Sequence, residues 1–318
     1  MDYIIPFLFL VFGFVLLVKG ADLFVDGASS IAKFFKVSSL VIGLTVVAFG
    51  TSLPEAAVSI SASIAGVDDV SLGNIVGSNI FNILFILGLS AAIVPQVVHG
   101  DLLSRDFLFS ILSAVILIPF YYFIGVDHVI TRLEGVFLLV LFALFLYAVF
   151  KNSKQVELLE VEDIKPKYPI NKALIITLLG LIGIVAGGVL VTNAARDIAL
   201  KLGMSEWLVG LTIVSIGTSL PELVTSVVAA FKKESEIAIG NVVGSNIFNI
   251  LFVLGFSATI SPINVNVTAL FDVIFLLVIS VVTYIFALSS RKISRIEGLF
   301  MFLAYLGYMA YIIMRDLN

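Results

Sequence analysis

The sequence predicts an all-α polytopic membrane protein with ten transmembrane helices in two five-helix repeats of inverted topology. Its composition, the spacing of its apolar segments and an internal repeat predict this fold. Of the 318 residues, 60% are hydrophobic and 13% are charged, and the mean hydropathy is +1.18. A soluble domain of this length cannot keep so much apolar surface away from water. We therefore expect the chain to be embedded in a lipid bilayer.

The charges and the cysteine count exclude several other classes of protein. The net charge of −4 is too small to indicate a nucleic-acid partner. The chain has no cysteine, which excludes disulfides, thiolate metal sites and cysteine nucleophiles. We expect no enzymatic site and no cofactor, and the sequence indicates no particular protein partner.

Ten apolar segments are long enough to cross a bilayer. A hydrocarbon core about 30 Å thick needs about 20 helical residues, at about 1.5 Å per residue. The first segment lacks a clear signal-peptide cleavage site, so we expect it to remain as a membrane helix. The predicted spans are residues 3–32, 40–65, 70–94, 106–125, 129–150, 171–200, 206–230, 236–261, 268–288 and 296–314.

The polar segment 151–170 is predicted to be a cytoplasmic linker between an N-terminal repeat, residues 1–150, and a C-terminal repeat, residues 171–318. Alternate connections between the spans are basic. Thirteen of the 18 lysines and arginines fall in one set of connections, which includes the linker, and four fall in the other. Because basic loops stay in the cytoplasm, we expect both termini to be extracellular.

Residues 41–95 match residues 208–262 at a constant shift of 167, with about 30 of the 55 positions identical. GTSLPE occurs in both copies, and GNIVGSNIFNILFILG in the first becomes GNVVGSNIFNILFVLG in the second. A repeat with an odd number of spans inserts its second copy from the opposite side. Such inverted repeats are typical of secondary transporters, which bind substrates near the midplane where the halves meet. A duplicated scaffold without transport is the alternative.

Glu55 and Glu222 lie within otherwise apolar spans. A carboxylate at this depth costs several kcal/mol unless it is partnered or functional. A proline directly before each glutamate has no N–H for the carbonyl four residues earlier, so each helix is predicted to break near Thr51 or Thr218. Backbone carbonyls freed in this way are tolerated where they line a cavity or meet another partner, such as a cation.

Neutral oxygen atoms recur at helical spacing around both glutamates. The side chains predicted to share these faces are Ser52, Glu55, Ser59, Asn74, Ser78 and Asn82, and in the second repeat Ser219, Glu222, Ser226, Asn241, Ser245 and Asn249. Serine and asparagine also hydrogen-bond neighbouring membrane helices, which is the structural alternative.

The ligand count favours calcium. Two bidentate carboxylates and two carbonyls supply about six oxygens, and Ca²⁺ takes about 6–8. Magnesium stays open but prefers strict octahedral geometry, and no nitrogen or sulfur cluster favours zinc or copper. Two glutamates neutralise one Ca²⁺, and the same pocket could instead hold several Na⁺ ions. Competition for shared carboxylates would couple the two ions, and three Na⁺ would make transport electrogenic.

Four acidic residues outside this pattern have less specific predictions. Asp22 and Asp26 are expected near the wet, outward end of the first span or at a kink, with at most a weak role in admitting ions. Glu134 and Glu297, each two residues after an arginine, are expected to be interfacial anchors.

The blocks GTSLPE and GNxVGSNIFNIL resemble the alpha repeats of the sodium/calcium exchanger family, within the cation/calcium exchanger superfamily, and the chain's size is similar to that of its small prokaryotic members. The resemblance implies a ten-helix antiporter of the plasma membrane that exchanges Na⁺ for Ca²⁺ by alternating access, with four central ion sites. It implies that Glu55 and Glu222 are the main calcium ligands. The further ligands that it implies are the Thr51, Thr218, Ala48 and Ser215 carbonyls, Ser52 with Ser78, Ser219 with Ser245, and Asn82 and Asn249 facing the middle.

The sequence departs from some relatives at one position. Potassium-dependent members of the family carry aspartate where Asn249 stands, so amides at both central positions weaken the expectation of potassium transport. The chain also lacks the calcium-sensing domain of animal exchangers. A calcium/proton exchanger that uses the same two glutamates and, with less support, a passive cation channel remain as alternative functions.

Overall fold

The computed structural model describes residues 3–98, 100, 102–121, 128–156, 166–203, 215–265 and 267–317. The chain is an all-helical, multi-pass membrane protein, as the sequence predicts. Within the described ranges, eight helices are long and apolar enough to cross a membrane, and nine if one bent pair counts as a single span. The expected span 206–230 lies partly outside the described residues.

The helices of the first half follow the apolar segments of the sequence to within a few residues, and some are interrupted by π-helical stretches, labelled η. They are α1 (Ile4–Phe35), α2 (Ser39–Ile42), η1 (Gly43–Val47), α3 (Ala48–Thr51), α4 (Leu53–Ile64), α5 (Asp68–Ile80), η2 (Phe81–Leu87), α6 (Gly88–Ile93), η3 (Leu102–Asp106), α7 (Phe107–Val115), α8 (Leu117–Pro119) and α9 (Arg132–Val156).

The second half contains a similar series of helices among its described residues. Its elements are α10 (Ile170–Lys201), α12 (Ser215–Thr218), α13 (Leu220–Phe231), α14 (Ser235–Ile247), η6 (Phe248–Leu254), α15 (Gly255–Ile260), α16 (Val267–Ser290) and α17 (Arg295–Leu317).

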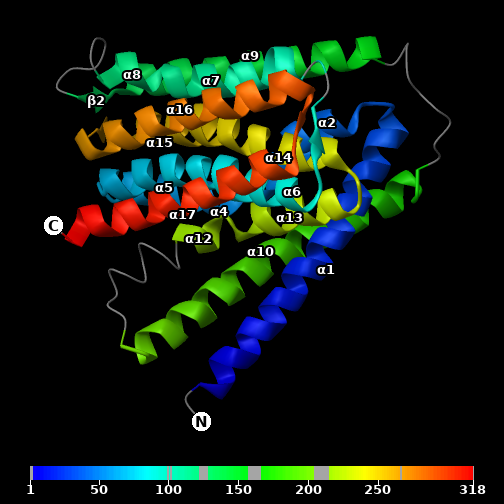
Figure 1. The fold of residues 1–318 in the computed structure, drawn as a ribbon, viewed down its shortest axis with the longest axis horizontal. Helices are drawn as coiled ribbons and strands as arrows, with labels where there is room; N and C mark the ends of the chain where they lie inside the picture. The colour runs from blue at the N-terminus through cyan, green and yellow to red at the C-terminus, as the bar shows by residue number, and fades with distance from the viewer. Residues whose placement is uncertain are drawn as a thin grey trace.

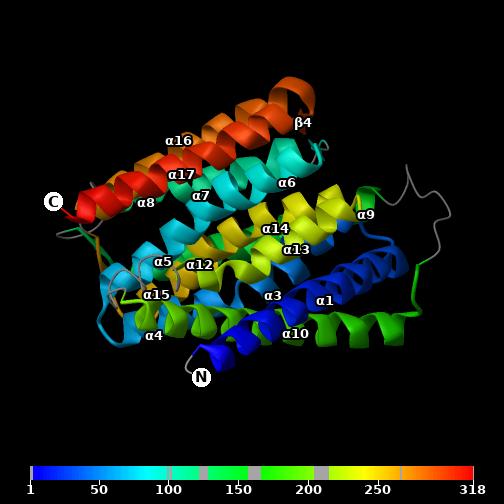
Figure 2. The ribbon, with the colours of Figure 1, turned by 60° about the horizontal axis from the view of Figure 1, so that its bottom comes forward.

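The helices form layers. The long helices α1 and α10 cross on one side of the molecule, running in opposite directions (Figure 1). Figure 2 shows α16 and α17 on the other side, with α5 and α14 between the two layers. Both chain ends lie toward the left of Figure 1, whereas the end of α9 and the start of α10 lie toward the right. The start of α1 and the end of α17 therefore lie at the side opposite to the end of α9 and the start of α10.

The helices α9 and α17 begin with the same cap. Glu134 accepts a hydrogen bond from the Thr131 backbone N–H at 2.6 Å, and Glu297 accepts one from the Ser294 N–H at 2.7 Å. This is the glutamate half of a capping box, which satisfies an N–H that the helix leaves free. Glu134 is also buried, and the structure shows it as a helix cap.

The crossing of α1 and α10 depends on glycines that the 167-residue shift relates. A Cβ atom at Gly20 would lie 2.7 Å from the Ile184 nitrogen, and one at Gly187 would lie 2.7 Å from the Leu17 nitrogen. Gly187 is the counterpart of Gly20, and Ile184 that of Leu17. Backbones approach this closely in membranes only where small residues line the contact.

Gly180→Ala is expected to destabilise the protein by about 1–3 kcal/mol, the usual cost of overpacking. Its new Cβ would lie 2.6 Å from the Phe24 nitrogen and 2.8 Å from the Gly20 carbonyl oxygen, so α1 must move away. The control is Gly188→Ala on the same helix, whose nearest contact would be an ordinary 3.5 Å to Pro221. Thermal unfolding of the purified variants in detergent compares them, and equal effects would show that this crossing is not tight.

The two halves also contact each other through their later helices and through short strands. A Cβ at Gly88 of α6 would lie 2.9 Å from the Gly298 carbonyl of α17, and a Cβ at Gly255 of α15 would lie 3.0 Å from the Gly135 carbonyl of α9. Two short antiparallel strand pairs follow the same pattern. These are β1 (Gln96–Val97) with β4 (Lys292–Ile293), and β2 (Val129–Ile130) with β3 (Ile263–Asn264). Helices and strands of each half thus pack against those of the other half.

Candidate cation-binding site

Each glutamate follows a helix break, as the proline before it predicts. The helix α3 ends at Thr51, α4 begins at Leu53, and the two segments are bent by 50°. Ser52 at the break has φ −84° and ψ 8°, and Ser219 at the break between α12 and α13 has φ −90° and ψ 7°. The break places a serine and a glutamate on the first turn of a new helix in each half.

The two breaks face each other and exchange hydrogen bonds. Ser52 donates from Oγ to Glu222 Oε1 at 2.7 Å, and Ser219 donates from Oγ to Glu55 Oε1, also at 2.7 Å. Ser219 Oγ also lies 3.2 Å from Ser78 Oγ on α5. Both glutamates are fully buried. The structure therefore brings the two carboxyl groups, one from each half, into one buried cluster, and each is held by the serine of the opposite half.

Asparagines on α5 and α14 fasten the glutamate helices in place. Asn74 donates to Ser59 Oγ at 2.9 Å and to the Glu55 backbone carbonyl at 3.3 Å, and Asn241 donates to Ser226 Oγ at 2.9 Å. These amides join neighbouring helices of one half. These hydrogen bonds agree with the alternative in which serine and asparagine join neighbouring helices.

Side-chain and backbone atoms near the breaks already form hydrogen bonds with other protein groups. Thr51 Oγ1 donates to Asn241 Oδ1 at 3.0 Å, which ties α3 to the other half. The Ala48 carbonyl accepts the Ser52 N–H at 3.1 Å and lies 3.4 Å from Thr51 Oγ1. Thr218 ends α12, and Ser215 begins it, but the Ser215 side chain lies outside the described part of the structure.

Several buried oxygens around the glutamates have no hydrogen-bond partner among the described residues. They are Glu55 Oε2, Glu222 Oε2, Asn82 Oδ1, Asn249 Oδ1 and Ser245 Oγ. Buried polar atoms are nearly always paired, because leaving one unpaired costs about 1–3 kcal/mol and more if it is charged. Carboxylate and amide oxygens accept hydrogen bonds and cannot donate them when the acid is ionised. Such a set of acceptors is what a cation requires.

The charge available in this cluster is limited to two carboxylates. Within the described ranges, no group of three or more histidine, cysteine, aspartate or glutamate side chains is arranged to hold a metal. The remaining oxygens are hydroxyls, amides and carbonyls. This donor set suits hard cations such as Ca²⁺ and Na⁺ and does not suit the softer transition metals.

The structure adds features that the sequence did not predict. Asn79 and Asn246, at equivalent positions of the two repeats, are buried and hydrogen-bonded across the halves. Asn82 and Asn249 lie in the π-helical stretches η2 and η6, where functional residues are often found. The identity of Asn79 and Asn246 in the two copies was a signal, but their spacing from the expected face gave no reason to include them.

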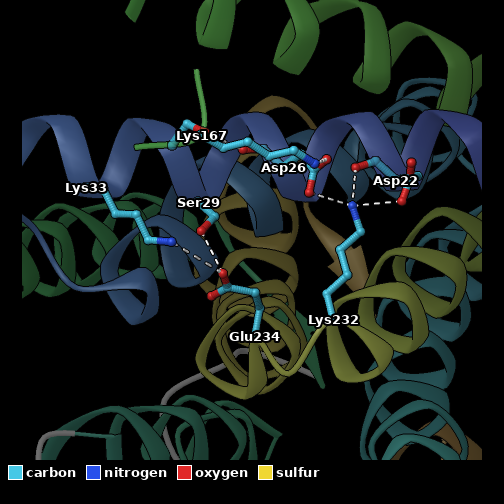
Figure 3. A network of polar contacts seen from close by, with 8 residues as sticks. Asp22, Asp26, Ser29, Lys33, Lys167, Lys232 and Glu234 are labelled. Atoms are coloured by element: carbon cyan, nitrogen blue, oxygen red, sulfur yellow. Dashed lines mark hydrogen bonds and ion pairs between the residues drawn. The ribbon is translucent and has the colours of Figure 1, made fainter. Parts of the chain in front are cut away.

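Asp22 and Asp26 belong to a separate ion cluster. Lys232 lies 2.7 Å from Asp22 Oδ1 and 2.6 Å from Asp26 Oδ1, and Lys167 lies 2.5 Å from Asp26 Oδ2 (Figure 3). The hydrogen bond to Asp26 raises the pKa of Lys167. Both lysines belong to the basic connections, so two expectations from the sequence do not agree: aspartates at the outward end of α1, and basic connections in the cytoplasm. The helix is also continuous there, so they mark no kink.

Known proteins resemble this chain over nearly its whole length. The family profile described as sodium/calcium exchanger protein matches residues 5–151 and 172–314. The putative antiporter CaxA of Alkalimonas amylolytica is 39% identical over 95% of this chain and 96% of its own length. The sodium/calcium exchanger MaX1 of Methanosarcina acetivorans is 34% identical over 96% of this chain and 97% of its own.

A solved structure shows the same fold. The sodium-calcium exchanger NCX_Mj superposes with a TM-score of 0.85 at 35% sequence identity, covering 97% of this chain and 98% of that one. The buried pair of glutamates, the broken helices that carry them and these likenesses agree. The chain belongs to the sodium/calcium exchanger family, whose members are membrane transporters and not enzymes.

Proposed function

We propose that this chain is an antiporter that exchanges Na⁺ for Ca²⁺ across the plasma membrane by alternating access. The observation that carries the proposal is the pair of buried glutamates from opposite halves. In each, one carboxylate oxygen is bonded to a serine and the other has no hydrogen-bond partner among the described residues. A buried charge without a partner is strongly unfavourable, and a cation that binds between the two carboxylates would offset that cost.

The ligands proposed for these ions are the residues that the family resemblance implies. Glu55 and Glu222 hold calcium, and Ser52, Ser78, Ser219 and Ser245 supply hydroxyls for flanking sodium ions. Asn82 and Asn249 add amide oxygens, and Thr51, Thr218, Ala48 and Ser215 add backbone carbonyls. The unpartnered oxygens of Ser245, Asn82 and Asn249 support this set.

Charge counting makes the exchange electrogenic. Two carboxylates neutralise one Ca²⁺, whereas three Na⁺ at the same carboxylates leave a net charge of +1. Each unit charge that crosses the membrane gains or loses about 2.3 kcal/mol per 100 mV. The membrane potential therefore contributes to the driving force.

Many transporters achieve alternating access with two inverted copies of one repeat, and we propose this arrangement here, together with ten spans and a division at the 151–170 linker. The glycine contacts of α1 with α10, and the exchanged contacts of α6 with α17 and of α15 with α9, come in pairs that the repeat relates. The family profile also matches in two segments that leave out residues 152–171. With the basic connections in the cytoplasm, both termini lie outside the cell.

Calcium/proton exchange is the second candidate, because the same two carboxylates could release calcium by binding protons. Calcium uptake into proteoliposomes distinguishes the two functions. With pH equal and buffered on both sides, an imposed outward sodium gradient is expected to drive calcium accumulation. Since three Na⁺ leave as one Ca²⁺ enters, net positive charge leaves, and an interior-positive potential is expected to accelerate uptake. Calcium uptake that is independent of sodium and is driven by a proton gradient would overturn the sodium proposal. Calcium flux without any counter-ion would indicate a channel.

A further inference from the structure

Four asparagines join the halves beside the glutamate pair. Asn79 donates from Nδ2 to the Asn246 backbone carbonyl at 3.1 Å, and Asn246 donates from Nδ2 to the Asn79 carbonyl at 3.3 Å. Asn249 donates from Nδ2 to Asn79 Oδ1 at 3.1 Å, and Asn82 donates from Nδ2 to Asn246 Oδ1 at 3.0 Å. All four side chains are buried. We call this arrangement the asparagine clasp.

The clasp determines which way each amide faces. A backbone carbonyl can only accept, so the atom that Asn79 presents to the Asn246 carbonyl must be its NH₂ group. The oxygen of Asn79 is therefore the atom that faces Asn249, and Asn249 must answer with its own NH₂ group. The Asn249 oxygen is left pointing away from the clasp, and it has no partner among the described residues.

The same reasoning holds for the other arm. The Asn79 carbonyl fixes the NH₂ group of Asn246, the Asn246 oxygen fixes the NH₂ group of Asn82, and the Asn82 oxygen is left buried and without a partner in the described chain. Asn82 lies one helical turn beyond Ser78, whose hydroxyl is 3.2 Å from the serine that holds Glu55. Asn82 therefore lies one helical turn from a serine of the carboxylate cluster.

We propose that Asn79 and Asn246 are positioning residues that aim the amide oxygens of Asn249 and Asn82, respectively, at the bound cation. The inference rests on the proposed function, because it assigns these oxygens to the cation site. Without the clasp, either amide could rotate and present its NH₂ group, whose partial positive charge repels a cation. Each half therefore orients a ligand that belongs to the other half.

A double-mutant cycle tests this assignment through calcium affinity, measured by equilibrium binding of ⁴⁵Ca²⁺ to the purified full-length protein. Asn79→Leu removes the acceptor that fixes Asn249, and we expect calcium affinity to fall about 10-fold or more, the usual effect of losing an outer partner of a metal ligand. In an Asn249→Ala background, Asn79→Leu is expected to cause little further loss, because the group that it orients is already absent.

The pair of Asn79 with Asn82 is the matched control. Asn82 lies three residues from Asn79 on the same chain segment but is oriented by Asn246, so Asn79→Leu and Asn82→Ala are expected to be additive. The mirror cycle, Asn246→Leu with Asn82→Ala, is expected to be non-additive, and it remains a test if Asn79→Leu fails to fold. Additive losses in both tested pairs, Asn79 with Asn249 and Asn246 with Asn82, would overturn the assignment. The asparagine clasp would then be a purely structural contact.

A different experiment would show that the proposed function is wrong. Sodium-driven calcium flux of the unmodified protein decides the counter-ion, whereas the cycle needs only calcium binding. A protein that exchanges calcium for protons would still show the expected coupling between Asn79 and Asn249.

Discussion

Glu55→Gln and Glu222→Gln are each expected to reduce calcium transport to background. The substitution keeps the size of the side chain and removes its formal charge. At an effective dielectric constant of about 20, two unit charges about 4 Å apart attract by about 4 kcal/mol, and a divalent ion doubles this. Because about 1.4 kcal/mol is a factor of ten in affinity, calcium affinity should fall by more than about 10³-fold.

The measurement is sodium-driven ⁴⁵Ca²⁺ uptake in proteoliposomes, with the protein content of each preparation matched. Glu134→Gln is the control, since it makes the same change at a buried glutamate whose oxygen caps α9 far along the chain from the breaks. Glutamine also accepts a hydrogen bond there, so transport should persist. Normal flux in either Glu55→Gln or Glu222→Gln would show that the two carboxylates are not shared ligands.

Ser219→Ala and Ser52→Ala are expected to raise the calcium concentration needed for half-maximal transport by about 10–100-fold. Each serine donates to the glutamate of the opposite half at 2.7 Å, and each is fully buried. A hydrogen bond to a charged group is worth about 1.5–3 kcal/mol, which corresponds to that range. Loss of the bond frees the carboxylate to rotate away from the position that calcium requires.

Ser63→Ala is the matched control for the serine variants. Ser63 is also buried and hydrogen-bonded across the halves, but it donates to the Ser257 backbone carbonyl at 3.1 Å and touches no carboxylate. Its loss should lower thermal stability and leave the apparent calcium affinity unchanged. If all three variants changed calcium affinity equally, the crossed bonds at the glutamates would have no special role.

The sequence predicts the membrane helices and the helix breaks well, because both have local causes. Apolar runs of sufficient length define the spans in any context. Proline at positions 54 and 221 removes a backbone N–H whatever surrounds it, and the helices do break at Thr51 and Thr218. The helical spacing likewise identified Ser78, whose hydroxyl lies 3.2 Å from Ser219 Oγ in the glutamate cluster.

Contacts between the halves could not be predicted from spacing. The sequence places Ser52 near Glu55 on one helix, whereas the structure bonds Ser52 to Glu222. Which of two equivalent glutamates a serine reaches depends on how the halves dock. The π-helical stretches and the two-residue strands are also set by this docking, since neither has a periodic pattern of its own.

Charged residues near the ends of spans were the least predictable. Asp26 looks unpaired in the sequence because its partners, Lys167 and Lys232, lie more than a hundred residues away. In the folded chain these lysines bring the end of the linker and the end of α13 onto α1 (Figure 3). Pairing of this kind follows from the tertiary structure alone.

The number of calcium ions bound per chain tests most directly whether the two halves build one shared site. Equilibrium binding of ⁴⁵Ca²⁺ to the purified protein should saturate at one ion per chain, should be displaced by Na⁺, and should vanish in Glu55→Gln and in Glu222→Gln alike. Two independent calcium ions per chain, with one retained in each glutamate variant, would mean that the carboxylates serve separate sites and would contradict the account.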